Sequence, residues 1–132
     1  MVVLIIGILV AIALPTFLGA RQRAQDRAAQ SDLRNGVAAA KVHFTDNDTY
    51  AGFTALVAEG IEPSATWTDA VTTTLSTLAI GNLGTSTVLI QTESASGIGF
   101  CIADTATGTV YGQVAAGADF ATSAACAAAT DW

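Results

Sequence analysis

The stretch that decides the fold is Met1-Val2-Val3-Leu4-Ile5-Ile6-Gly7-Ile8-Leu9-Val10-Ala11-Ile12-Ala13-Leu14-Pro15-Thr16-Phe17-Leu18, and the first ionisable side chain after it is Arg21. At about 1.5 Å per residue, twenty helical residues reach about 30 Å, which matches the hydrocarbon core of a bilayer. No later stretch of the chain is apolar for so long. We therefore predict an N-terminal helix that lies in lipid or is covered by other protein.

The helix is expected to continue beyond the apolar run. Residues 21–45 contain no proline and consist mainly of helix-forming residues. Asn35-Gly36 interrupts this stretch and should cost the helix about 1 kcal/mol. The apolar stripe nevertheless keeps its phase across that pair, so we predict one amphipathic helix that ends near Phe44–Asp46. The stripe consists of Ala29, Leu33, Val37, Ala40 and Phe44.

Charge is unevenly distributed along the 132 residues, whose net charge is −6. Residues 1–41 hold all five basic side chains and two acidic ones, a net charge of +3, whereas residues 42–132 hold nine acids and no base. This division suits electrostatic packing between copies, although the acids also serve simply to solvate the head. Nucleic-acid binding through the head is not expected, because no basic cluster follows Lys41.

Cys101 and Cys126 are the two cysteines of the chain. An even count behind a membrane-insertion signal favours a disulfide formed in an oxidising compartment. Such a bond should stabilise the head by roughly 3 kcal/mol in the chain-entropy model. The alternatives are two buried free thiols or a metal pair, but two cysteines do not complete a tetrahedral site.

The rest of the chain predicts a small sheet. Residues 46–85 show little regular pattern and read as a connection, with a short helix over 54–59 stopped by Gly60. Strand patterns then follow at 87–92, 99–104 and 109–114, separated by turn residues. Their spacing predicts an antiparallel meander with one face against the helix. The alanine-rich tail is expected to form a short helical turn held to Cys101.

The sequence predicts no enzyme, cofactor or small-molecule substrate. His43 is the only imidazole and is interpreted as a surface or packing residue. Asp46-Asn47-Asp48 hints at a calcium loop, but Tyr50 occupies the position of a third ligand and no downstream glutamate completes the cage. We therefore predict no metal site. Asn47-Asp48-Thr49 also matches a glycosylation sequon, a pattern that often arises by chance.

The run Ile6–Leu18, followed by Ala20-Arg21, resembles the N-terminal helix of type IV pilins and of their pseudopilin relatives. Residues 46–50 also resemble the point at which the pilin helix ends. The resemblance implies an α+β fold with a long helix on a three- to four-stranded antiparallel sheet and a C-terminal disulfide loop. Residues 1–20 would form the membrane anchor and filament core, and residues 21–132 the head, including the helix over about 21–45.

The resemblance further implies a structural subunit of a helical extracellular filament, serving adhesion, motility or DNA uptake. Its partners would be identical copies, the inner membrane before assembly and the pilus assembly machinery, with the cell surface as final location. Candidate intersubunit charges are Arg21, Arg23, Arg27 and Arg34. Residues expected to pack in the filament core are Leu4, Ile5, Ile8, Leu9, Ile12, Leu14, Phe17 and Leu18.

Gly7 and Pro15 are weak points of the apolar helix. Pro15 has no N–H to donate to the carbonyl of Ala11, and its ring crowds that turn. A simple kink and local unwinding both remain open from the residues alone. The resemblance favours unwinding between Gly7 and Pro15 when the chain assembles.

Two observations leave alternatives open. Pilins carry a basic leader, a glycine cleavage site, an aromatic residue and an early glutamate, so we expect residues upstream of Met1. Arg21 and Arg23 directly after the apolar run would by themselves keep the head cytoplasmic, whereas the disulfide favours the opposite side. The alternative functions are a type II secretion pseudopilin and a membrane-anchored extracytoplasmic binding domain.

Overall fold

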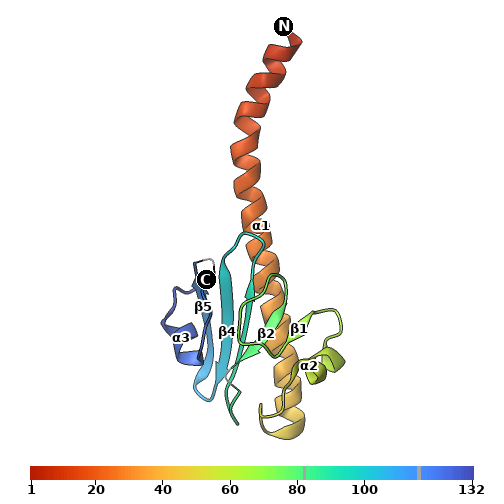
Figure 1. Ribbon diagram of the computed structural model, residues 1–132, viewed down its shortest axis with the longest axis vertical. Coiled ribbons are helices and arrows are strands. Elements are labelled where there is room, and N and C mark those ends of the chain that lie inside the picture. The colour runs from red at the N-terminus through yellow and green to blue at the C-terminus, as the bar shows by residue number, and fades with distance from the viewer. Residues whose placement is uncertain (82, 116) are drawn as a thin grey trace.

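The computed structural model describes residues 1–81, 83–115 and 117–132. Its longest element is helix α1, Val2–Asn47, which at about 1.5 Å per residue is about 70 Å long. The helix runs without interruption through Pro15 and through Asn35-Gly36. Its N-terminal half projects alone, away from a head that contains every other element (Figure 1).

Helix α1 ends at Asn47, one residue beyond the predicted end near Phe44–Asp46. Asp48 adopts a left-handed backbone conformation, with φ of 55°, and its N–H donates to the carbonyl of Phe44 at 2.7 Å. The side chain of Asn47 donates to the carbonyl of His43 at 3.0 Å. These contacts satisfy carbonyl groups that the last helical turn leaves free.

The head contains a five-stranded sheet in the order β1-β2-β3-β4-β5. The strands are β1 (Trp67–Thr68), β2 (Leu78–Gly81), β3 (Val88–Glu93), β4 (Gly99–Thr105) and β5 (Gly108–Val114). The three strands predicted from the sequence are β3, β4 and β5, and they form the expected antiparallel meander.

The prediction of a three- to four-stranded antiparallel sheet is wrong, because the sheet is mixed. Strand β2 pairs antiparallel with β3, but β1 pairs parallel with β2, with Trp67 opposite Leu78. Both strands lie within residues 46–85, which the sequence predicted to be a connection with little regular structure. Strand β2 is buried along its whole length, so its apolar residues do not alternate with polar ones, and β1 has only two residues.

The predicted apolar stripe packs α1 onto one face of the sheet, as expected. Ala29, Leu33, Val37 and Ala40 are buried, and Phe44 is partly buried against the same core. Gly36 belongs to this contact. A Cβ at that position would lie 3.0 Å from Leu78 Cδ1 and 3.3 Å from Trp67 Cη2, so the glycine lets the helix approach β2 closely.

Two short helices complete the head. Helix α2, Ala55–Ile61, is capped by Thr54 and packs on α1 through the buried Ala58. It includes Gly60, which was expected to stop it; a glycine near a helix end costs too little to do so. Helix α3, Ser123–Ala128, covers the other face of the sheet and is the short helical turn predicted for the tail.

The disulfide between Cys101 and Cys126 joins β4 to α3, which confirms the predicted pair. Both residues are fully buried beside Leu89, Ala103 and Phe120. Gly112 makes this packing possible. A Cβ there would lie 2.4 Å from the carbonyl oxygen of Cys126 and 2.9 Å from the Sγ of Cys101. Any side chain at this position would therefore push α3 away from the sheet.

Candidate functional site

The most distinctive surface is the apolar half-helix, which we define as residues 2–18 of α1. Its large apolar side chains are between 47% exposed, at Val10, and 84% exposed, at Val3. Helix α1 contains an 18-residue window with a mean hydropathy of 2.7, none of it buried, and it is long and apolar enough to cross a membrane. A membrane anchor and a signal sequence both meet that criterion. Such a surface is far larger than the apolar patches that monomeric proteins expose.

Two hydrogen bonds from the head hold α1 at Asp26. The hydroxyl of Ser94 donates to the Oδ1 of Asp26 at 2.7 Å, and the hydroxyl of Ser96 donates to the same oxygen. Ser94 is itself buried, in the turn between β3 and β4. The first buried apolar residue of α1 follows at Ala29. Asp26 is therefore the first residue of α1 that these hydrogen bonds tie to the head, and the β3–β4 turn also lies beside residues 18–25.

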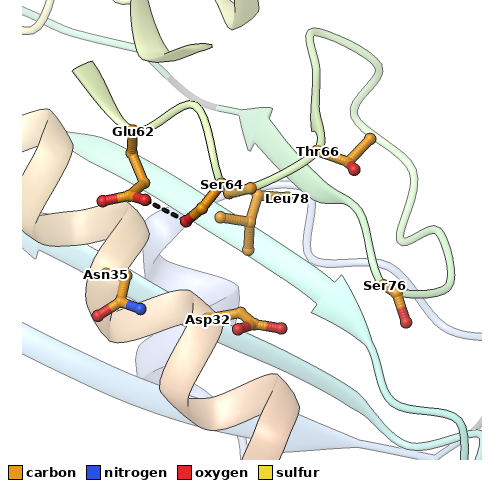
Figure 2. Close-up of a pocket in the computed structure, with 8 residues that line it drawn as sticks. Asp32, Asn35, Glu62, Ser64, Thr66, Ser76 and Leu78 are labelled. Carbon is orange, nitrogen blue, oxygen red and sulfur yellow. Dashed lines mark hydrogen bonds between the residues drawn. The ribbon is translucent and has the colours of Figure 1, made fainter. Parts of the chain in front are cut away.

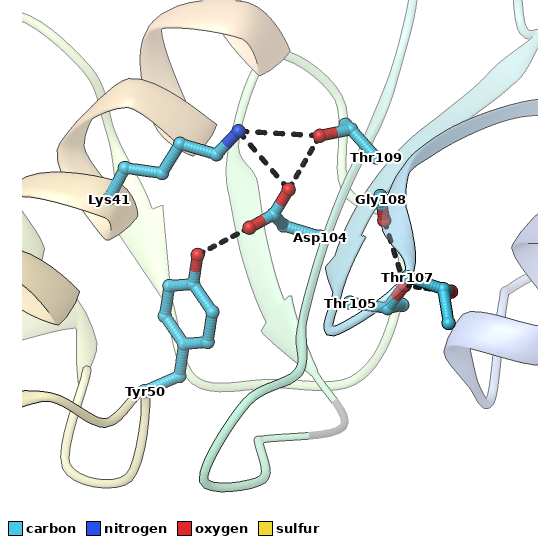
Figure 3. A network of polar contacts seen from close by, with 7 residues as sticks. All are labelled: Lys41, Tyr50, Asp104, Thr105, Thr107, Gly108 and Thr109. Carbon is cyan, nitrogen blue, oxygen red and sulfur yellow. Dashed lines mark hydrogen bonds and ion pairs between the residues drawn. The ribbon is translucent and has the colours of Figure 1, made fainter.

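A polar network fixes the opposite end of α1 to the sheet (Figure 3). Lys41 Nζ lies 3.1 Å from Asp104 Oδ1, and the hydroxyl of Thr109 donates to that oxygen at 2.5 Å. Tyr50, just beyond the helix, donates to Asp104 Oδ2 at 2.5 Å. Within the described residues, Lys41 and Asp104 form the only ion pair.

The network shifts the pKa values of two of its members. Burial by itself raises the pKa of Asp104, but hydrogen bonds from Thr109, Tyr50 and Lys41, together with the charge of Lys41, outweigh burial and lower that pKa. Burial, the hydrogen bond to Asp104 and the charge of that carboxylate all raise the pKa of Tyr50. Every polar group of the network has a partner inside the head, so we assign it a structural role.

The residues predicted to pack in a filament core all lie on the apolar half-helix and are exposed in the single chain. Gly7 and Pro15 lie within regular helix, and the hydroxyl of Thr16 donates to the carbonyl of Ala13 at 2.9 Å. Unwinding on assembly remains a prediction. The exposed residues of the predicted core are Leu4, Ile5, Ile8, Leu9, Ile12, Leu14, Phe17 and Leu18.

The four candidate arginines differ in their surroundings. Arg21, Arg23 and Arg27 are exposed, with no carboxylate partner in the described part of the chain. The guanidinium of Arg34 lies 5.1 Å from the centre of the Trp132 ring, a cation–π contact. Trp132 also packs edge-to-face against Phe100 and Tyr111. The sequence interpretation missed this role of the last residue, because only the fold brings it beside α1.

No chemistry-bearing cluster emerges among the described residues. His43 packs against Phe53, with ring centres 5.5 Å apart, as a packing residue would. Residues 1–81, 83–115 and 117–132 contain no group of three or more histidine, cysteine or acidic side chains placed to hold a metal ion.

One hollow was not predicted from the sequence. It lies between α1 and the β1–β2 side of the head, with a cavity volume of about 110 Å³ (Figure 2). Its polar lining consists of Asp32, Asn35, Glu62, Ser64, Thr66 and Ser76. Burial raises the pKa of the Asp32 carboxyl. The sequence could not reveal this hollow, because its residues come from three separate segments.

Comparison of the chain with protein families, with characterised proteins and with solved structures finds no match.

Proposed function

We propose that this chain is the structural subunit of a type IV pilus, which assembles through its apolar half-helix into a helical extracellular filament. The observation that carries the proposal is the division of α1 into two parts. One part is fixed to a head with its own core, and the other part is apolar on all sides and uncovered. The resemblance of residues 6–21 to pilins supports the same conclusion.

The hydrophobic effect explains why such a half-helix cannot remain in water. Residues 1–18 include thirteen large apolar side chains of Met, Val, Leu, Ile or Phe. At ~1.5–3 kcal/mol for each fully buried side chain, covering them is worth about 20–40 kcal/mol as an upper estimate relative to water. Lipid and the packed apolar half-helices of neighbouring copies offer similar apolar surroundings. A membrane therefore serves as the reservoir from which subunits enter the filament.

The head suits an extracytoplasmic location. Its buried disulfide holds α3 on the sheet, and disulfides form and persist in oxidising compartments. The many short polar residues, Thr and Ser above all, give the head a surface that needs no partner for solvation. We therefore place the head outside the cytoplasmic membrane before assembly and on the filament surface afterwards.

In the filament, the helix is expected to unwind between Gly7 and Pro15. Pro15 costs a helix interior roughly 3 kcal/mol and Gly7 about 1 kcal/mol, so residues 8–14 are the easiest part of the apolar half-helix to open. Opening lengthens the rise from ~1.5 Å towards ~3.3 Å per residue, so six or seven residues add about 10 Å. A filament map with continuous hydrogen bonding through residues 8–14 would show this part of the proposal to be wrong.

The proposal is tested by changing the apolar half-helix without changing the head. Leu9→Asp places a charge on the fully uncovered part of α1, whereas Gln22→Asp places the same charge just beyond it, on an exposed polar residue. We expect the first variant to lose filaments and the second to keep them, measured by electron microscopy of sheared cell-surface material. Equal filament yield from both variants would contradict assembly through this segment.

A further inference from the structure

Four basic residues form one row along α1. Arg27, Arg34 and Lys41 follow one another at seven-residue intervals, and Arg23 precedes Arg27 by four. Because a helix has 3.6 residues per turn, these spacings place the four side chains on one flank, within roughly 40° of one another around the axis. We call these residues the basic row. The basic row borders the β5 side of the head. Lys41 donates a hydrogen bond to Thr109 of β5. Arg34 stacks on Trp132, which in turn packs on Tyr111 of β5.

The basic row is only partly neutralised within the chain. Lys41 pairs with Asp104, and Arg34 stacks on Trp132. Arg27 is the next member of the row towards the N-terminus, and it is exposed without a carboxylate partner among the described residues. Arg23 is in the same situation, one helical turn further. The outer end of the row thus carries two free guanidinium groups.

The hollow lies on the opposite flank of the same helix. At about 100° per residue, Asp32 is rotated by roughly 140° from Arg27 and roughly 180° from Lys41, and the core face lies between. Figure 2 shows Asp32 and Asn35 on α1 across from Glu62 and Ser64, and Thr66 and Ser76 also line the hollow. No basic side chain of the described segments pairs with Asp32 or Glu62, and the Glu62 carboxylate accepts a hydrogen bond from Ser64.

The lining of the hollow has the chemistry of a guanidinium site. Two carboxylates, of Asp32 and Glu62, supply negative charge, and the Asn35 amide oxygen is a further acceptor. A guanidinium presents five N–H donors in a planar fork and is more weakly hydrated than an ammonium, which suits it to a partly enclosed acidic site. The cavity volume of about 110 Å³ is well below the roughly 300–1,000 Å³ of small-molecule pockets, so a single side-chain head group is the appropriate occupant.

We infer that the hollow receives Arg27 from a second copy of this chain, so that the basic row of one subunit packs against the Asp32 flank of the next. This inference rests on the proposed function and specifies its lateral contact. The two surfaces differ and lie on opposite sides of the subunit, so the contact is head-to-tail, and a joined pair of copies still has one free basic row and one free Asp32 flank. Such a contact propagates into a ring or an open helical polymer and does not stop at a dimer.

The inference also predicts the register of neighbouring copies. Asp32 lies five residues beyond Arg27, so parallel copies joined in this way are offset by about 8 Å along the helix axis. Because Asp32 and Arg27 are exposed in the free chain, the contact should weaken with ionic strength.

Cysteine cross-linking in the full-length chain tests the contact. The variant D32C/R27C carries one new thiol on each flank, and the native cysteines are already bonded to each other and buried. Under mild oxidation of filaments, we expect a ladder of dimers, trimers and longer products. Each single variant, D32C or R27C, should give no ladder, because a chain with one new thiol links to one other chain only.

The matched control is S31C/R27C, which moves the first thiol by one residue and roughly 100° away from the hollow. We expect the ladder of D32C/R27C to exceed that of the control at least several-fold. Equal ladders in filaments that form normally would overturn the inference and leave the proposed function intact. If the unmutated chain also forms no filaments, the proposed function is overturned, and the inference with it.

Charge exchange provides a second, independent measurement. D32R and R27D should each lower the amount of sedimentable polymer several-fold, because each brings like charges together, and D32R/R27D should restore it. Failure of the double variant to recover, with the far-ultraviolet circular dichroism of the head unchanged, would also overturn the inference.

Discussion

The two halves of α1 share one continuous backbone and differ in what covers them. From Ala29 onward, one face of the helix is buried against the sheet, and Leu33 and Ala40 are fully covered. Over residues 2–18 no side chain is buried. Their patterns explain the difference: the head half has apolar residues on one stripe, whereas the apolar half-helix is apolar on every side. A helix of the first kind needs one partner surface, and a helix of the second kind needs to be surrounded.

The comparison also separates folding from assembly. The head has two buried clusters, a disulfide and a polar network, none of which involves residues 2–18. Changes in the head should therefore alter its stability, and changes in the apolar half-helix should alter assembly.

Truncating one leucine in each half should give the largest difference. Leu33→Ala removes a fully buried side chain and should lower the free energy of unfolding of the head by about 2–5 kcal/mol. Leu9→Ala makes the same chemical change where the side chain is 61% exposed, and should leave that free energy unchanged. Urea unfolding of the detergent-solubilised chain, followed by tryptophan fluorescence, measures both. Equal destabilisation by the two variants would mean that the halves are not independent.

Removing the disulfide should destabilise the head by an amount of the same order. The chain-entropy model gives roughly 3 kcal/mol for a loop of this size, with residues 25 apart in sequence. Cys101→Ser/Cys126→Ser should therefore lower the melting temperature of the head, while the helical signal of the apolar half-helix in detergent persists. Calorimetry and circular dichroism report the two effects separately. An unchanged melting temperature would show that the bond contributes nothing to the head.

Gly112→Ala should lower the free energy of unfolding of the head by about 1–3 kcal/mol, because the added Cβ would lie 2.4 Å from the Cys126 carbonyl oxygen. Gly19→Ala is the matched control, since a Cβ at Gly19 meets no atom within 4 Å. We expect Gly112→Ala to expose the disulfide to reductant and the control to leave it protected, as measured by thiol labelling over time. Identical labelling rates would contradict the close packing of α3.

The smallest effect is a pH dependence confined to the head. The lowered pKa of Asp104 means that its stabilising contribution is fully present above pH ~4 and is lost as the pH falls through the folded-state pKa. The raised pKa of Tyr50 acts at the other extreme, so that its contribution declines above pH ~10. Asp104→Asn should flatten the acid side of the stability profile, as measured by urea midpoints between pH 2 and 7. An unchanged profile would assign the acid dependence to other carboxylates.

Local patterns were sufficient to predict much of this fold. The helix stripe that includes Leu33, the three meander strands and the cysteine pair all follow from periodicity, turn residues and residue type. Strands β1 and β2 could not be predicted in this way. A two-residue strand has no period, and β2 is buried on both faces and so lacks alternation.

One of the two candidate sites could be predicted from the sequence and the other could not. The apolar half-helix is evident from composition alone, because the first twenty residues carry no ionisable side chain. The Asp32 hollow is lined by three segments that are distant in sequence: α1, the chain after α2 and the residues before β2. No local sequence pattern predicts that these segments lie side by side. Gly36 illustrates the limit well. In the sequence it is predicted to weaken the helix, whereas in the fold its missing side chain leaves room for Leu78.

The central claim is that residues 2–18 are covered by other copies of this chain. The measurement that tests it most directly is electron cryo-microscopy of material sheared from the surface of producing cells, at a resolution that shows side chains. We predict a helical filament whose axis is filled by residues 2–18 of many copies, with the heads outside. The account would be contradicted if the chain remained in the membrane fraction as separate particles and no filament contained it.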